Sequence, residues 1–142
     1  MGKVKKKAMM YLTAVIIIIT TALCFVIFAS GETDVNNITF LKGYGWEVRT
    51  KAIESEEVII PKPFDRVYEN YNKIQLEAGL DLVPYMGMKG VRYTYIVENY
   101  PGDVDEDVRA NVICIDNKPV GGDIMTVSID GFMHSLKFPE NE

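Results

Sequence analysis

The sequence predicts an α+β protein in two parts: an N-terminal transmembrane helix, and a two-layer domain in which one long helix packs on an antiparallel β-meander. Three observations carry this prediction. Residues 8–29 are uncharged and mostly apolar, residues 64–78 have one apolar helical face, and several later segments alternate with period two. No helical segment separates those later strands, so antiparallel pairing is expected. The expected domains are residues 1–31 and 32–142.

The N-terminal apolar run, Ala8 to Ala29, has the length of a membrane span. As a helix it would extend about 33 Å at about 1.5 Å per residue, enough for a hydrocarbon core of about 30 Å. Lysines at positions 3, 5, 6 and 7 precede the run and acidic residues follow it. The positive-inside rule therefore predicts a single-pass cell-membrane protein with its N-terminus inside and its C-terminal domain outside. A signal peptide cleaved after Gly31 is the alternative.

Charge is distributed unevenly along the chain. All 20 acidic residues lie beyond the apolar run, against 11 of the 15 basic residues, so the outer part has a net charge of −9. Nucleic-acid phosphates require basic patches, and we therefore expect no nucleic-acid partner. The two cysteines, Cys24 and Cys114, fall in different parts of the chain, so no intrachain disulfide is expected and the domain depends on its apolar core.

The first elements of the domain are a short helix, an extended segment and the long helix. Apolar residues at three-residue spacing predict a helix over 33–44, with Thr33 or Asp34 as caps and glycines at its end. Residues 46–60 are rich in extended-structure formers, with a turn at 52–56. Pro63 and Gly79 suit the start and the end of the helix over 64–78.

The remaining chain predicts a meander. Residues 91–97 and 108–114 alternate between apolar and polar or small side chains, and a third strand is expected over 120–129. Residues 116–119 form the expected hairpin loop. Gly121 and Gly122 indicate a bulge or a close approach of another segment.

No residue pattern predicts a catalytic or metal site, so no cofactor is expected. His134 is the single histidine, has no paired zinc-ligand spacing, and Ser135 beside it lies outside any nucleophile-elbow motif. Cys114 sits among apolar residues, as a core cysteine does. The acidic segment 103–107 resembles a calcium loop, but Val108 and Cys114 stand where an EF-hand needs glycine and glutamate.

Tyrosines and amides form the candidate interaction face. Such side chains combine large contact area with adaptable hydrogen bonding. The alternative is that the tyrosines close the edge of the core. The residues of this candidate face are Tyr71, Asn72, Gln75, Tyr93, Tyr95 and Tyr100.

Several short motifs resemble an uncharacterised family of small, N-terminally membrane-anchored proteins from Gram-positive anaerobic bacteria, each with one domain of unknown function. The resemblance covers about residues 38–138 and implies no activity and no functional residues. The motifs that carry it are Tyr44-Gly45-Trp46-Glu47-Val48, Glu57-Val58-Ile59-Ile60-Pro61, Tyr71-Asn72-x-x-Gln75, Asn99-Tyr100-Pro101, Gly121-Gly122-Asp123-Ile124 and Asp130-Gly131-Phe132-Met133.

Two functions follow as hypotheses. The first is a non-enzymatic extracytoplasmic interaction or sensory module, tethered to the membrane by its N-terminal helix and contacting an unidentified membrane or envelope protein. The second is a small cell-envelope hydrolase that uses a carboxylate pair. No spacing selects that pair, and its candidates are Asp81, Glu98, Asp123 and Asp130.

Overall fold

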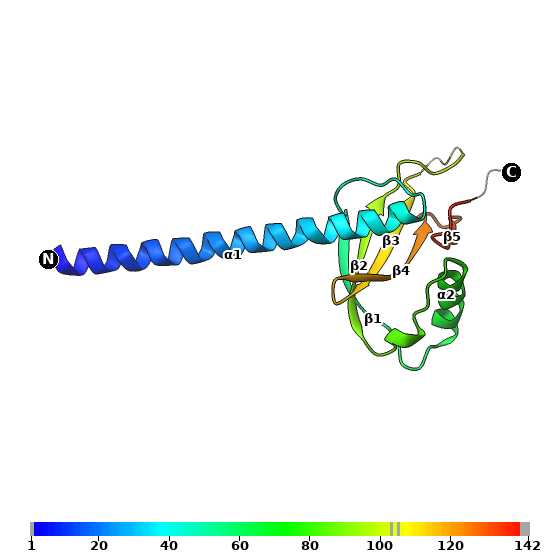
Figure 1. Cartoon of the computed structure of the whole chain (residues 1–142), viewed down its shortest axis with the longest axis horizontal. Coiled ribbons are helices and arrows are strands. Elements are labelled where there is room, and N and C mark those ends of the chain that lie inside the picture. Colours follow the sequence, from blue (N-terminus) through cyan, green and yellow to red (C-terminus); the bar gives the residue numbers. More distant parts are fainter. Residues whose placement is uncertain (1, 103, 105, 140–142) are drawn as a thin grey trace. The chain divides into compact units, whose positions relative to one another are not determined.

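The computed structural model describes the backbone of residues 2–102, 104 and 106–139, and the side chains of these residues except 2–6, 8 and 25–30. The chain divides into two compact units, Met1–Thr33 and Asp34–Glu142. Unit 1 is helical throughout its described part, and unit 2 contains all the strands (Figure 1).

Helix α1 spans Gly2–Gly43 without a break. The prediction that a separate helix begins at Thr33 or Asp34 is therefore wrong. The predicted transmembrane helix is also corrected: among the described residues, no helix is both long enough and apolar enough to cross a membrane. Part of the predicted span, Ala8 and residues 25–29, lies outside the described side chains. The single-pass topology and cell-membrane location predicted from this span are therefore not supported.

Unit 2 is built on a five-stranded antiparallel sheet with the strand order β1-β2-β3-β4-β5, which confirms the predicted meander. Its topology is the simplest possible one, because each strand pairs with its neighbour in the sequence. The strands are β1 (Glu54–Ile59), β2 (Lys89–Ile96), β3 (Arg109–Ile115), β4 (Lys118–Met125) and β5 (Met133–His134). The last strand was not predicted.

Unit 2 has three layers rather than the two predicted. The C-terminal turns of α1 cover one sheet face, where Asn37 reaches Cys114 and Leu41 belongs to the core. Helix α2 (Arg66–Glu77) covers the other face, where Gln75 reaches the backbone of β4. Neighbouring residues of a strand point to opposite faces, which is why Cys114 and Ile113 belong to different apolar clusters. We call the first face the α1 face and the second the α2 face.

Residues next to each end of helix α2 explain where it begins and ends. The Asp65 carboxylate accepts a hydrogen bond from the backbone N–H of Tyr68 at 2.8 Å and thereby caps the N-terminus. Gly79, with φ 74°, takes the left-handed conformation that ends the helix. A short 3-10 helix, η1 (Val83–Tyr85), follows before β2. The long amphipathic helix of the sequence prediction is thus confirmed.

Candidate functional site

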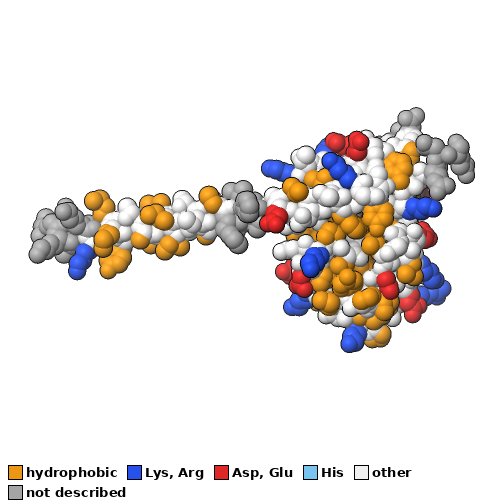
Figure 2. All heavy atoms as spheres, viewed as in Figure 1, with side chains coloured by type: hydrophobic (Ala, Val, Ile, Leu, Met, Phe, Trp, Pro, Cys, Tyr) orange, Lys and Arg blue, Asp and Glu red, His pale blue; other side chains and the backbone are white. Residues whose placement is uncertain are grey.

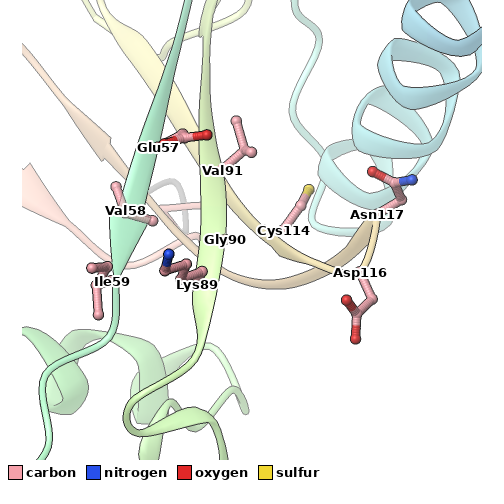
Figure 3. Close-up of a pocket in the computed structure, with 9 residues that line it drawn as sticks. All are labelled: Glu57, Val58, Ile59, Lys89, Gly90, Val91, Cys114, Asp116 and Asn117. Carbon is pink, nitrogen blue, oxygen red and sulfur yellow. The ribbon is translucent and has the colours of Figure 1, made fainter.

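A hollow lies beside strand β1 in the described surface of unit 2. It has a volume of about 550 Å³ (Figure 3). Figure 3 shows the residues of β1 and β2 on one side, Cys114 of β3 in the middle, and Asp116 and Asn117 of the β3–β4 turn on the other side. The residues that line it are Glu57, Val58, Ile59, Lys89, Gly90, Val91, Cys114, Asp116 and Asn117. We call this set the β1 hollow.

The hollow combines an apolar floor with a charged rim. Val91 and the exposed Ile59 supply apolar surface. The exposed side chains of Glu57, Lys89 and Asp116 stand around it, so the rim carries two carboxylates and one ammonium group. Figure 2 likewise shows apolar surface interspersed with charged side chains on one face of unit 2. A ligand with an apolar body and a polar end matches this distribution.

The β3–β4 turn holds one side of the hollow in place. Asp116 and Asn117 both have positive φ, 49° and 60°, and the pair Ile115 and Lys118 closes the hairpin around them. Two central residues with positive φ make the type I′ turn, whose twist matches that of antiparallel strands and which favours Asp, Asn and Gly. The loop predicted at 116–119 is thus a two-residue turn that presents Asp116 and Asn117 to the hollow.

Strand β1 also leaves one edge of the sheet open. It is the first strand of the sheet and pairs only with β2. Just beyond it, Ile60 donates its N–H to Met88 at 3.0 Å, so the even-numbered residues of β1 direct their backbone groups at β2. The N–H and C=O groups of Ser55, Glu57 and Ile59 therefore point away from the sheet. Within the described part of the chain, no hydrogen bond reaches them.

A family comparison covers this region. The family described as "Domain of unknown function (DUF4830)" matches residues 40–124, from the last turn of α1 through nearly all of β4. The chain belongs to this family. The predicted resemblance to an uncharacterised family is thereby confirmed for the family itself. The DUF4830 region includes the whole β1 hollow. No curated protein and no solved structure matches the chain.

On the α1 face, a buried chain of hydrogen bonds ties α1 to the sheet of the DUF4830 region. The Cys114 thiol donates to Asn37 Oδ1 at 3.1 Å, Asn37 Nδ2 donates to the Tyr95 hydroxyl at 3.0 Å, and that hydroxyl donates to Asp34 Oδ1 at 2.7 Å. Burial raises the pKa of Cys114 to about 11, although its bond to Asn37 acts in the opposite direction. Cys114 is a structural thiol, as predicted.

The two cysteines are expected to differ sharply in reactivity. At pH 8, about one Cys114 thiol in a thousand is ionised, and the group is buried, whereas Cys24 is exposed. A disulfide reagent should therefore modify one thiol of the native chain quickly and the second at least about 100-fold more slowly. The variant Cys24→Ser isolates the slow reaction. Fast labelling of Cys114 in native Cys24→Ser would contradict this assignment.

On the α2 face, Asp123 is the centre of a buried polar cluster. Its carboxylate accepts hydrogen bonds from the Tyr71 hydroxyl at 2.6 Å and from Asn111 Nδ2 at 2.9 Å. Asn111 in turn accepts from the Thr94 hydroxyl at 2.7 Å. Burial raises the pKa of Asp123, while the two hydrogen bonds and the positive charge of Arg92 oppose the rise. The carboxyl group is thus a structural element of the interior.

Gln75 is also buried on the α2 face, but it is not part of the Asp123 cluster. Its Oε1 accepts the backbone N–H of Gly122 at 2.8 Å, while its buried Nε2 has no partner among the described atoms. A Cβ atom on Gly121 would lie 2.9 Å from Gln75 Oε1, so glycine is needed there for the helix to approach the strand. The predicted close approach at Gly121 and Gly122 is confirmed.

Replacing Asp123 by asparagine is expected to change how stability depends on pH. A carboxyl group whose pKa is raised in the folded state binds protons more tightly there, so its contribution to stability is largest at low pH and is lost as pH rises through the folded-state pKa. Asp123→Asn removes this ionisation while keeping the shape. The stability of the variant relative to the parent should therefore increase from pH 4 to pH 8. Denaturant titrations at several pH values measure this difference, and parallel curves for the two proteins would contradict it.

His134 lies in an aromatic cluster at the other end of the sheet. Its Nδ1 donates to the Ser135 carbonyl at 2.7 Å, since a carbonyl oxygen only accepts, and its Nε2 contacts the Tyr100 hydroxyl at 3.1 Å. Phe132 stacks on the histidine ring at a centroid distance of 5.5 Å. Ser135 is buried. Both imidazole nitrogens are therefore engaged, and neither is directed at the neighbouring serine hydroxyl.

The six residues of the candidate interaction face occupy three separate places. Tyr71, Asn72 and Gln75 lie between α2 and the sheet, and their partners are Asp123, Asp81 and Gly122. Tyr93 and Tyr95 lie on the α1 face and Tyr100 in the aromatic cluster. They do not form one continuous surface. Whether any of them contacts a partner stays a prediction.

The candidate carboxylates have different surroundings. Asp81 accepts from Asn72 and from the backbone of Val83, which lowers its pKa. Glu98 pairs with Arg49 at 3.9 Å. Two residues of the acidic segment, 103 and 105, lie outside the described residues. Within the described part, no group of three or more histidine, cysteine or carboxylate side chains is placed to hold a metal ion.

Neither the β1 hollow nor the open edge of β1 was predicted from the sequence. One signal was available, because a short strand rich in glutamate and followed by Pro61 is typical of a protected sheet edge. The presence of Glu57 and Asp116 at one hollow depends on the pairing of three strands, which no local pattern determines.

Proposed function

We propose that this chain is a non-enzymatic module that binds a segment of another protein. The observation that carries the proposal is the open edge of β1 beside the β1 hollow. Unsatisfied backbone groups on a sheet edge are a ready template for another chain, and proteins use such edges for recognition. The hollow next to that edge supplies room for side chains, which give specificity.

The reactive side chains of the domain support binding over catalysis. Cys114 is buried with a raised pKa, and the His134 nitrogens are engaged by Ser135 and Tyr100. The alternative, a hydrolase with a carboxylate pair, has weaker support, because Asp123 is enclosed and Asp81 and Glu98 have local structural partners. The resemblance in motifs further supports the proposal that the chain comes from a Gram-positive anaerobic bacterium.

A display library of random dodecapeptides tests this function. The full chain is immobilised, and the library is selected against it and, in parallel, against the chemically unfolded chain. We expect enriched sequences that bind the folded chain alone, with affinities in the micromolar range common for short peptides. If no sequence is enriched on the folded chain above the unfolded control, the proposal of a peptide-binding module is wrong.

A further inference from the structure

The open edge of β1 has a definite chemical character. Three of its six residues, Glu54, Glu56 and Glu57, are exposed glutamates. Arg92 pairs with Glu56 at 2.6 Å. No described basic side chain lies within 4 Å of the Glu54 or Glu57 carboxylate. Alternation along the strand puts Glu54 and Glu56 on the α2 face and Glu57 on the α1 face. A strand added to this edge would meet negative charge on both of its sides.

Glutamates on an edge strand also serve to prevent aggregation, and that role explains part of this pattern. It does not explain the hollow beside them. The hollow lies on the same face as Glu57 and Ile59, the residues whose backbone groups point outward. A docking strand would therefore direct every second side chain toward it. Backbone pairing and side-chain insertion are compatible at this one edge.

The apolar surface and the charges of the hollow indicate which kind of side chain it can bind. The apolar surface of Ile59 and Val91 suits a methylene stem, and the Glu57 carboxylate suits a cationic end, while Asp116 lies across the hollow (Figure 3). Lysine and arginine combine these two parts, because they bury the stem and keep the charged head near solvent. The ammonium group of Lys89 stands on the rim and disfavours deep entry by a second cation. The site thus takes one basic side chain.

The charges of the strand also argue against a second copy of this chain as the occupant. Two β1 strands meeting edge to edge would place glutamates opposite or diagonal to glutamates, which is destabilising in a sheet. The chain as a whole is acidic as well, with a net charge of −5. A basic partner gains both from pairing at the edge and from the field of the domain.

From these observations we propose that β1 binds an extended, basic segment of a partner protein as an additional strand, with one lysine or arginine side chain in the β1 hollow. The recognition mode is strand addition, in which main-chain hydrogen bonds provide affinity and side-chain pockets provide specificity. This inference rests on the proposed function and specifies its partner.

Three synthetic heptapeptides test the inference on the full chain. The first alternates lysine and valine (KVKVKVK). The second has the same charge but a central proline (KVKPKVK), which removes one N–H and disfavours the strand. The third carries glutamate in place of lysine (EVEVEVE). Fluorescence anisotropy should show binding of the first peptide, at least tenfold weaker binding of the second, and no binding of the third.

Two variants locate the site. Glu57→Lys should weaken binding of KVKVKVK at least tenfold, whereas the control Glu77→Lys, the same charge change on exposed α2, should leave it unchanged. Hydrogen exchange should show new protection at the amides of Ser55, Glu57 and Ile59 when the peptide is bound. Equal binding of the first two peptides, or equal effects of the two variants, would show charge attraction alone and overturn the inference.

The remaining outcomes separate this inference from the proposed function. If β1 amides become protected with rising protein concentration and without peptide, the occupant is a second copy, and the inference is wrong. If the random library yields binders that are acidic or that leave β1 unprotected, the chain is a peptide-binding module with another site. If the library yields nothing and KVKVKVK does not bind, both proposals fail.

Discussion

Replacing Trp46 by alanine is expected to lower the free energy of unfolding by about 3–5 kcal/mol, the range for removing a large buried aromatic side chain. Trp46 is fully buried, and its indole N–H donates to the Leu136 carbonyl at 2.7 Å. Its ring contacts Phe138 at a centroid distance of 4.5 Å and stacks on Tyr100 at 5.8 Å. The substitution removes these contacts together and leaves a cavity and an unpaired carbonyl.

Denaturant unfolding followed by circular dichroism measures this effect, because Trp46 is the chain's single tryptophan and its fluorescence disappears in the variant. Trp46→Phe keeps an aromatic ring without the N–H and should lose less stability. Val67→Ala changes a side chain that is 71% exposed and should shift the free energy by less than about 0.5 kcal/mol. A loss below about 1 kcal/mol in Trp46→Ala would show that the aromatic cluster does not support the core.

Gly122→Ala is expected to destabilise the domain by about 1–3 kcal/mol, as overpacking of a well-filled interior does. An added Cβ would collide with the backbone carbonyl oxygen of Asn111 and would lie 2.9 Å from Leu136 Cδ1. The Asn111 carbonyl belongs to β3, which is paired on both sides and cannot withdraw without disturbing β2. The strain must therefore be absorbed by the sheet itself.

Gly43→Ala is the matched control, because a Cβ at Gly43 meets nothing within 4 Å. It should change stability by less than about 0.5 kcal/mol. The difference between the two midpoints of denaturation isolates close packing from the general effect of replacing glycine. Equal effects of Gly122→Ala and Gly43→Ala would contradict the contact between β4 and Leu136.

Local signals in the sequence predicted most elements of unit 2. The prediction of the α2 helix follows from its apolar period, from Pro63 near its start and from Gly79 at its end, whereas the Asp65 cap is seen only in the structure. The strands follow from alternation and from turn residues, above all at Asp116 and Asn117. These features depend on residues that are close together in the sequence, which is why local patterns could predict them.

The number of layers was the main error within unit 2, and the sequence contained a signal for the correct number. Val112, Ile113, Cys114 and Ile115 form an uninterrupted apolar run, which indicates a strand covered on both faces. The structure buries all four. The prediction for residues 108–114 is alternation alone, which does not indicate a second covered face. The helix predicted over 33–44, which is the end of α1, was therefore not assigned to that face.

Two other features could not be derived from local patterns. Strand β5 has two residues, too few for any periodicity, and pairs because Met133 and His134 come to lie beside the end of β4. The polar interior around Asp123 depends on contacts with Tyr71, which lies 52 residues earlier. The β1 hollow likewise joins strands that are adjacent only after folding.

The contact between Trp46 and the C-terminal segment has a consequence for the order of events during synthesis. The β2, β3 and β4 hairpins connect sequence neighbours and can form as soon as those residues leave the ribosome. Leu136 and Phe138, which enclose Trp46, are made 90 or more residues after it. The α1 face of a nascent chain thus stays open to water or to chaperones until residues 136–138 have emerged, and truncation before residue 136 would leave the sheet with an unfilled core.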